Sequence, residues 1–384
     1  MNDELLTRGI ERIYPSKEAL EKVLATGKKL KIYFGIDPTG PLHIGHGANL
    51  LKLREFQDVG HEIIILIGDF TAMIGDPTDK MAARVKLSQE QVKENFKNYQ
   101  DQISKILDPE KTKFKFNSEW LNKLSLDRIL ELSSEFTAGQ MFERDMFQER
   151  VKHEKPIYLH EFLYPLMQAY DAVMLDVDVQ IGGNDQTFNM LAGRTLMRKL
   201  KNKEKFVIAT KLLVDPTGKK MGKTEGNMVT LDETPAEMYG QVMSWPDSLL
   251  SLAFEICTRL SLDKLGASAA SDPKAAKMKL AREIVRLYHD EKKSVEAETD
   301  FIAKFQKKEA PEAPEEIAAQ AGEKLADVLL HAGAVKSKSD FRRLIKDGAV
   351  HNLDGAVITD PDFVVTKDLR LKLGKHRFFL LVLF

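Results

Sequence analysis

The chain has 384 residues and a formal net charge of −1, from 57 Lys+Arg and 58 Asp+Glu. This length predicts two or three folding units, and 43% hydrophobic with 30% charged residues excludes a disordered or fibrous chain. The near-neutral charge argues against a surface that is basic all over, although it allows a local basic patch. A single cysteine, Cys257, excludes internal disulfides and cysteine-based zinc cages. The N-terminus lacks a signal-peptide pattern and no apolar run is long enough to cross a membrane, so we expect a cytoplasmic protein.

Residues 1–231 alternate predicted strands with predicted helices. After a strand at 31–36, apolar and small residues recur from Ile44 at the spacing of a buried helix face. Residues 62–67 form an almost unbroken β-branched run, which is typical of a strand that helices cover on both faces. The alternation predicts a parallel sheet of Rossmann type. Further along the chain we expect a helix at 89–107 and strands at 177–181 and 206–214.

After residue 231 the pattern changes, and from Asp247 to Lys308 only helical patterns occur. Thr234-Pro235-Ala236-Glu237 predicts a helix start with a capping box and a proline at the first helical position. A stretch rich in Pro, Ala and Glu at 307–322 predicts a linker. Beyond it, helical patterns and strand-like segments at 363–365 and 369–373 indicate a further compact unit. The predicted fold class is therefore a Rossmann-type α/β domain (1–231), an all-α domain (232–306) and a small α+β domain (323–384).

The segment His43-Ile44-Gly45-His46 lies between the first predicted strand and its helix. Strand-to-helix junctions of parallel sheets favour anions, because backbone N–H groups point outward there. Two imidazoles and a glycine at this place suit close contact with a triphosphate, although histidines on a turn are often ordinary surface or core residues. The i, i+3 spacing and the lack of an evident third ligand argue against a metal site.

A second segment, Gly218 to Thr224, contains two lysines three residues apart. It is one residue short of a phosphate-binding loop and is followed by turn residues, so we reject that motif. Lysine-rich loops are common on surfaces. Two such lysines are also suited to hold the charge that spreads over a triphosphate during nucleotidyl transfer.

Together, His-Ile-Gly-His after the first strand and Lys-Met-Gly-Lys-Thr after the last strand resemble the two signatures of class I aminoacyl-tRNA synthetases. Gly222 and Thr224 stand where that family usually has serines. Both lysines are therefore kept, while the pattern of hydroxyl groups differs.

Residues 161–172 predict an apolar helix that carries a polar stripe. Tyr164, Gln168 and Asp171 fall at i, i+4 and i+7, on one side of that helix. Such a stripe either meets other polar groups in the core or lines a ligand pocket, and the spacing alone leaves both open.

Residues 164–171 and 180–186 resemble segments of bacterial tyrosyl-tRNA synthetases, as do 33–39 and 68–80. The resemblance covers nearly the whole chain. It implies activation of L-tyrosine with ATP to tyrosyl-adenylate and pyrophosphate, and then transfer of tyrosine to the terminal ribose of tRNA(Tyr). It also implies that Mg²⁺ accompanies ATP, that no protein-bound metal is needed, and that the protein is a homodimer with an interface around residues 114–150.

The same resemblance implies roles for individual residues, and their chemistry suits those roles. For tyrosine it implies Tyr33 and Asp171 at the phenolic hydroxyl, Asp76, Tyr164 and Gln168 at the ammonium group, and Thr71 and Gln186 in the pocket wall. For ATP it implies Gly35, Asp37, Gly45, Gly183, Asp185, Lys80, Arg84 and Lys223. As catalytic groups it implies His43, His46, Lys220, Lys223 and Thr224, which would stabilise charge on the phosphates.

Near the C-terminus, Lys338, Arg342 and Lys346 fall along one helical stripe, and Arg343 adds a fourth basic residue. Such a run is usually a solvated helix face. The stretch is, however, similar to the S4 RNA-binding module of many bacterial tyrosyl enzymes, which implies that these four residues contact tRNA phosphates. Residues 321–384 hold 11 Lys+Arg and 8 Asp+Glu, so the basic charge is local.

Three rival functions fit parts of these observations. A tryptophanyl-tRNA synthetase shares the fold and signatures, but the Tyr33 and Asp171 pair and the RNA-binding tail favour tyrosine. A small-molecule nucleotidyltransferase would not need the tail, and a protein that only binds RNA would leave the pocket residues unexplained.

Overall fold

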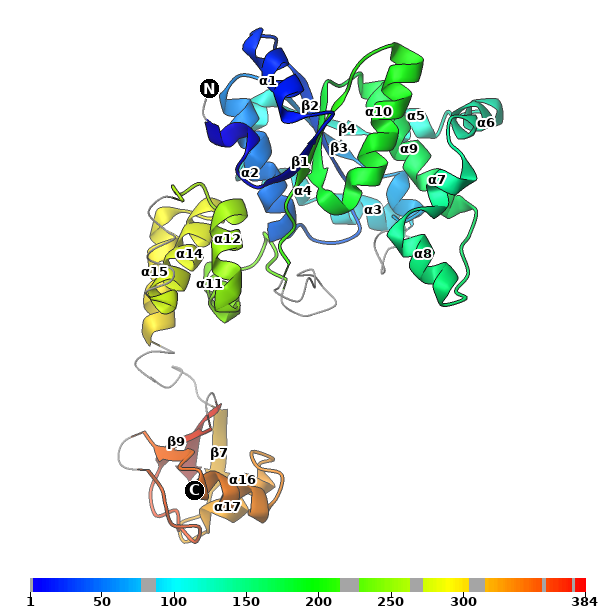
Figure 1. Ribbon diagram of the computed structural model, residues 1–384. Coiled ribbons are helices and arrows are strands. Elements are labelled where there is room, and N and C mark those ends of the chain that lie inside the picture. Colours follow the sequence, from blue (N-terminus) through cyan, green and yellow to red (C-terminus); the bar gives the residue numbers. More distant parts are fainter. Residues whose placement is uncertain are drawn as a thin grey trace. The chain divides into compact units, whose positions relative to one another are not determined.

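The computed structural model describes residues 3–76, 88–214, 228–262, 272–303, 315–353, 357–374 and 377–384. The chain divides into two compact units, Met1–Glu298 and Thr299–Phe384 (Figure 1). In the part of the chain that is described, no helix combines the length and the apolar character that crossing a membrane requires.

The first unit is built on a six-stranded sheet with the order β1-β6-β5-β2-β3-β4. Strands β2 to β6 run parallel, and the edge strand β1 is antiparallel to β6. Buried β-branched and aromatic residues fill the central strands, as expected for a sheet with helices on both faces. The strands are β1 (Ile10–Tyr14), β2 (Lys31–Ile36), β3 (Glu62–Ile67), β4 (Thr112–Phe116), β5 (Val179–Gly183) and β6 (Phe206–Thr210).

Helices cover both faces of this sheet (Figure 1). On one face α9 and α10 pack against each other and against Tyr33, Ile64 and Leu66. Helix α2 packs against β3 and β5 on the other face. The helices of this α/β part are α1 (Lys17–Ala25), α2 (Ile44–Asp58), α3 (Gln89–Phe96), α4 (Tyr99–Ser104), α5 (Ser118–Leu121), α6 (Leu126–Ser134), α7 (Ala138–Phe142), α8 (Asp145–Lys152), α9 (His160–Leu175) and α10 (Thr187–Lys201).

The structure confirms the α/β class and the parallel Rossmann-type sheet, and it corrects several element boundaries. The helix expected at 89–107 is divided into α3 and α4, and the last strand ends at Thr210 rather than 214. Strand β5 begins at Val179 rather than 177. Strand β1 was not predicted, because an edge strand with mostly exposed side chains has no clear apolar pattern.

The helical part of the first unit follows the sheet in the chain. Thr234 begins α11 with the predicted capping box: its hydroxyl accepts from Glu237 N at 3.3 Å, and Glu237 accepts from Thr234 N at 3.1 Å. The helices are α11 (Pro235–Ser244), α12 (Leu250–Cys257), α14 (Pro273–Tyr288) and α15 (Glu291–Phe301).

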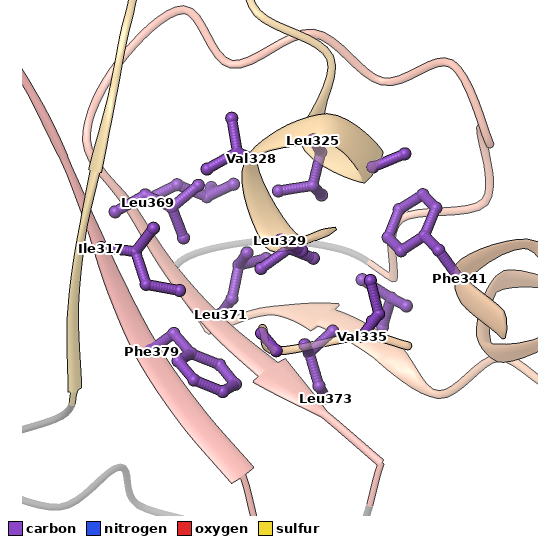
Figure 2. Packing of buried hydrophobic residues seen from close by; sticks show 14 of the residues in the cluster. Ile317, Leu325, Val328, Leu329, Val335, Phe341, Leu369, Leu371, Leu373 and Phe379 are labelled. Atoms are coloured by element: carbon purple, nitrogen blue, oxygen red, sulfur yellow. The ribbon is translucent and has the colours of Figure 1, made fainter. Parts of the chain in front are cut away.

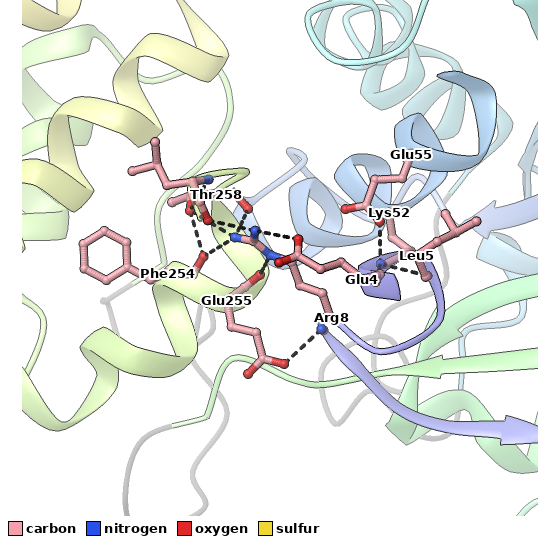
Figure 3. Close-up of polar contacts among 10 residues, drawn as sticks. Glu4, Leu5, Arg8, Lys52, Glu55, Phe254, Glu255 and Thr258 are labelled. Atoms are coloured by element: carbon pink, nitrogen blue, oxygen red, sulfur yellow. Dashed lines mark hydrogen bonds and ion pairs between the residues drawn. The ribbon is translucent and has the colours of Figure 1, made fainter. Parts of the chain in front are cut away.

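Arg8 joins this helical part to the sheet (Figure 3). Its buried guanidinium donates to the carbonyl oxygens of Phe254, Glu255, Thr258 and Leu260 at 2.8–3.0 Å. These carbonyls lie at the C-terminal end of α12, where helix carbonyls lack partners and a cation is favoured. One buried side chain therefore fixes α12 against the segment that leads into β1.

The second unit is a four-stranded sheet with two helices packed on it, and the order is β7-β10-β9-β8. Leu325 and Leu329 of α16 and Phe341 of α17 pack with Leu371 and Phe379 of the sheet (Figure 2). The elements are β7 (Glu315–Ala319), α16 (Leu325–His331), α17 (Lys338–Lys346), β8 (Val350–Asn352), β9 (Leu369–Leu373) and β10 (Arg377–Leu383).

This unit corrects two expectations. The predicted linker 307–322 contains β7, which pairs in parallel with β10, so the ordered unit begins before residue 323. The Pro, Ala and Glu composition of the stretch hid a strand that only Ile317 and Ala319 anchor in the core. The strand expected at 363–365 is reduced to an isolated bridge between Lys324 and Val364.

Candidate active site

The candidate site lies where the strand order of the sheet reverses. From β2 the chain continues to β3 and β4 on one side, while β5 and β6 lie on the other side. In open parallel sheets, ligands bind at the carboxyl ends of the strands at such a reversal, because the two connections leave a crevice between them. Asp37, Gly68, Asn117 and Asn184 directly follow β2, β3, β4 and β5 at this edge.

An open space lies above the central strand β2. Tyr33 and Gly35 share one face of that strand, and Tyr33 is fully buried there. Gly35 is exposed although strands pair on both sides of β2, and a Cβ atom at this position would have no described atom within 4 Å. The space above Gly35 can therefore accept part of a ligand.

Asp171 of α9 forms the polar end of this space. Its Oδ1 accepts a hydrogen bond from Trp120 Nε1 at 2.7 Å, and its Oδ2 accepts from Asn117 Nδ2 at 3.3 Å. Burial raises the pKa of Asp171 well above its ordinary value, while these two donors act in the opposite direction. Burial and Asp171 likewise raise the pKa of Tyr33. Tyr33 packs in one core cluster with Ala169 and Ala172 of α9, so the buried tyrosine and the buried Asp171 belong to elements that pack together.

A second carboxylate, Asp37, stands at the end of β2. Its Oδ1 accepts from the Thr71 hydroxyl at 2.7 Å and its Oδ2 from the Tyr164 hydroxyl at 2.8 Å. Burial is the main cause that raises the pKa of Asp37 to about 7, against the effect of those two donors. Gly68 makes room for this cluster, because a Cβ atom there would lie 1.8 Å from Asp37 Oδ1. Asn117 connects the two clusters by donating to Thr71 Oγ1 at 3.0 Å.

A third carboxylate, Asp76, lies three residues after the short 3-10 helix η2 (Thr71–Met73). It accepts from Gln186 Nε2 at 2.7 Å, and Gln186 in turn accepts from Asn189 Nδ2 at 2.8 Å. Gln168 of α9 has a buried side-chain oxygen that makes no hydrogen bond with a described residue. An acceptor oxygen of this kind, with the Asp76 carboxylate, suits a bound ammonium group.

The His43 and His46 rings lie against each other at the N-terminus of α2, with their planes tilted by 36°. His43 Nδ1 accepts from Gly45 N at 3.1 Å, His46 Nδ1 accepts from His43 N at 3.2 Å, and the ring centroids are 4.0 Å apart. Because both Nδ1 atoms accept backbone N–H groups, Nε2 carries the proton in each neutral ring. The start of the helix therefore presents two imidazole N–H donors, an arrangement that suits phosphate oxygens.

Five predicted residues, Lys80, Arg84, Lys220, Lys223 and Thr224, lie outside the described residues. The chain beyond the second segment is nevertheless anchored beside the histidines: Ile44 N donates to Val229 O at 2.9 Å, and His43 forms a bridge with Thr230. The described chain therefore resumes beside the first signature.

Most of the predicted pocket residues lie at this edge of the sheet. Tyr33, Thr71, Asp76, Tyr164, Gln168, Asp171 and Gln186 surround it, as do Asp37, Gly183 and Asp185. Sequence reasoning missed Asn117 and Trp120, which hold Asp171. A polar residue directly after a strand was a usable signal for Asn117; no signal was available for Trp120, because its contact depends on packing.

A further missed residue is Arg144, which precedes α8. It is buried, its guanidinium lies over the rings of Phe147 and Phe188 at 5.3 and 5.0 Å, and its two terminal nitrogens make no hydrogen bond among the described residues. Burial lowers the pKa of Arg144, whereas Asp76, Tyr164 and Glu161 act to raise it, so Arg144 belongs with the polar groups around Asp76.

Comparison with known proteins agrees with this site. The family model of class I tRNA synthetases (W and Y) matches residues 25–306. The chain belongs to this family. Tyrosine–tRNA ligases of Carboxydothermus hydrogenoformans and Legionella pneumophila are 43% and 44% identical to it, over 98% and 97% of this chain and 96% and 95% of theirs.

The solved structures agree as well. A C-terminally truncated mitochondrial tyrosyl-tRNA synthetase of Coccidioides posadasii is 26% identical with a TM-score of 0.62, over 76% of this chain and 88% of that one.

Proposed function

We propose that this family member is a tyrosine–tRNA ligase of the cytoplasm. It activates L-tyrosine with ATP and then transfers the tyrosine to the terminal ribose of tRNA(Tyr). The observation that carries the choice of tyrosine is the buried pair of Tyr33 and Asp171 beside the open space over Gly35. A phenolic hydroxyl both donates and accepts a hydrogen bond, and this pair offers one acceptor and one hydroxyl donor.

The test is ATP–pyrophosphate exchange with each amino acid in turn. We expect tyrosine to stimulate the exchange and phenylalanine to be much poorer, because a site built for a hydroxyl leaves its own polar groups unpaired when the hydroxyl is absent. Stimulation by tryptophan instead of tyrosine would identify the protein as a tryptophan-specific member of the family. Exchange without any amino acid dependence would contradict a ligase.

The chemistry requires positioning more than proton transfer. The tyrosine carboxylate is already ionised and attacks the α-phosphorus of ATP in line, and pyrophosphate leaves with the Mg²⁺ that accompanied ATP. The ring would lie over Gly35, with the phenol between Tyr33 and Asp171. Asp76, Tyr164 and Gln168 would hold the ammonium group. The N–H groups of His43 and His46 would stabilise the charge on the phosphates, and Lys220, Lys223 and Thr224 would hold the pyrophosphate.

Tyrosine binding is expected to release protons near neutral pH. The ammonium group would lie beside Tyr164, whose hydroxyl is bonded to Asp37, and a cation at this distance favours the ionised carboxylate. The pKa of Asp37, about 7 without ligand, should therefore fall in the complex, and tyrosine affinity should rise with pH between about 6 and 8. Calorimetry in buffers of different ionisation enthalpy measures the released protons. Asp37→Asn should abolish the release; equal release by that variant would assign the proton to another group.

The second unit provides a basic helix for the tRNA. Lys338, Arg342, Arg343 and Lys346 of α17 are exposed, while Phe341 and Ile345 face the core. Lys338 pairs with Asp327 at 2.5 Å and Arg343 with Asp340 at 2.7 Å. Arg342 and Lys346 form no ion pair with a described residue. We infer that these two contribute most to phosphate binding in a module of S4 type.

The variant Arg342→Ala/Lys346→Ala is therefore expected to weaken tRNA binding at low salt. Each lost phosphate contact should reduce the slope of log affinity against log salt by about 1. Lys17→Ala/Lys22→Ala on α1 removes the same charge elsewhere and is the matched control. An unchanged slope in the α17 variant, measured by filter binding over a salt series, would remove this helix from the interface.

An apolar stripe on α6 supports a homodimer. Leu126 and Leu130 are 71% and 62% exposed, and they lie one turn apart on the same face within the predicted interface 114–150. We expect Leu126→Glu/Leu130→Glu to give a monomer in sedimentation analysis, because burying two carboxylates costs several kcal/mol. Val59→Glu, at a similarly exposed valine, should keep the oligomeric state of the wild type. A dimer that persists in the α6 variant would place the interface elsewhere.

A further inference from the structure

Lys205 is a buried lysine that neither signature nor pocket motif includes. It directly precedes β6 and is fully buried. No carboxylate of the described residues pairs with it. Its ammonium group instead donates to Gln180 Oε1 and to Met190 O, the latter at 2.9 Å, and lies 5.8 Å from the centre of the Tyr33 ring. Burying an ammonium group without a counter-charge costs free energy of folding, so we ask what function these contacts serve.

Helix α10 makes room for this ammonium group. A Cβ atom at Gly193 would lie 2.7 Å from Lys205 Nζ. Burial lowers the pKa of Lys205 well below its ordinary value. Whether charged or neutral, the amine remains a hydrogen-bond donor, so its contact with Gln180 is kept.

The contact with Lys205 decides which way the Gln180 amide points. Gln180 is the direct neighbour of Tyr33 across the β2–β5 pair and is 2% exposed. Gln180 Oε1 accepts from Lys205 Nζ, so the NH₂ group of the amide faces away from the lysine. Directly paired residues of neighbouring strands point to the same face, so the Gln180 amide lies on the Tyr33 side of the sheet; it lowers the pKa of Tyr33, against the larger effect of burial and the effect of Asp171.

The Tyr33 hydroxyl is buried and makes no hydrogen bond with a described residue, so its position relative to the Gln180 amide decides its role when a ligand binds. Toward an NH₂ group it can act only as an acceptor. Its own proton is then left for the pocket, where it can be donated to the oxygen of a bound phenol. Asp171, already supplied with donors by Trp120 and Asn117, remains the acceptor for the proton of that phenol.

We propose that Lys205 is a positioning residue for tyrosine specificity, acting through the orientation of the Gln180 amide and the Tyr33 hydroxyl. This inference rests on the proposed function. With the amide fixed, the pocket offers one donor and one acceptor, which only a hydroxyl-bearing ring satisfies. Without Lys205 the amide can turn. The Tyr33 hydroxyl can then donate to Gln180 or Asp171, and it no longer distinguishes a substrate with a phenolic hydroxyl from one without it.

The main test compares kcat/KM for tyrosine and phenylalanine in ATP–pyrophosphate exchange. Lys205→Met is expected to lower the tyrosine-to-phenylalanine ratio about tenfold, the loss of one oriented hydrogen bond. Gln180→Met should lower it similarly, and the double variant should be no worse than either single variant, because both remove the same orientation. Lys203→Met, two residues away at a lysine paired with Asp176 and Asp178, is the control and should keep the ratio.

A second variant keeps the lysine and protects the test against misfolding. Gln180→Glu retains the shape and the acceptor for Lys205 but replaces the NH₂ donor by an oxygen, so it should also lower the ratio while the protein stays folded. Equal losses for both amino acids in Lys205→Met, additive losses in the double variant, or an unchanged ratio in Gln180→Glu would each overturn the proposal. Failure of tyrosine to stimulate exchange by the wild type would instead contradict the proposed function.

Discussion

Asp171→Asn is expected to lower kcat/KM for tyrosine by about 10³-fold, from the loss of a charge-assisted hydrogen bond and a stranded donor. The carboxylate accepts from Trp120 Nε1 and Asn117 Nδ2, which leaves its remaining lone pairs for the phenolic proton. An asparagine amide brings an NH₂ group to a place where every neighbour donates. One donor must then lose its partner in a buried site.

Phenylalanine provides the internal comparison for this prediction. It offers no phenolic proton, so its poor activity should fall little in Asp171→Asn, and the preference for tyrosine should nearly disappear. Asp178→Asn applies the same change to another buried carboxylate, which is bonded to Lys28 and to Lys31 N. We expect that control to lose stability and keep the preference. Steady-state exchange kinetics measure both, and equal preference in Asp171→Asn and wild type would remove Asp171 from recognition.

The central strands and the location of the site could be predicted because their signals are local. The β-branched run 62–67 begins and ends at the same residues as β3. The polar residues after β2 mark the carboxyl edge of the sheet. The stripe of Tyr164, Gln168 and Asp171 on α9 also lies on one side of a real helix. Periodicity and turn chemistry are sufficient for such features.

The partners within the site could not be predicted, since they depend on packing between distant segments. Tyr164 was expected beside Asp76, but its hydroxyl bonds Asp37, which is 127 positions away in the chain. Trp120 and Lys205 lie outside every motif and enter the site because α5 and the start of β6 pack beside it. Strand β7 could not be predicted for a related reason: its partner strand, β10, lies some 60 residues later in the chain.

His46→Ala and Lys223→Ala are each expected to slow formation of tyrosyl-adenylate by about 10²- to 10³-fold, the usual cost of removing one oriented donor from a developing charge. His46 is fixed at the start of α2 by the hydrogen bond from His43 N to its Nδ1. Its Nε2–H is therefore already oriented before the phosphates bind, and no conformational entropy is lost in orienting it. Lys223 lies outside the described residues, and the chain that follows it is bonded beside His43 at Val229 and Thr230. Both act on phosphates and neither contacts the amino acid, so the Kd of tyrosine should change little.

Rapid quench measurement of a single turnover separates these two quantities. The adenylate rate at saturating tyrosine and ATP should fall in both variants, while equilibrium dialysis with tyrosine should give a Kd close to that of the wild type. His153→Ala, at an exposed histidine of the turn after α8, is the control for the substitution itself. A normal adenylate rate in either variant would contradict its role. A weakened tyrosine Kd with a normal rate would move the residue from the phosphate side of the site to the amino acid side, because stabilisation that is present only in the transition state cannot alter ground-state binding.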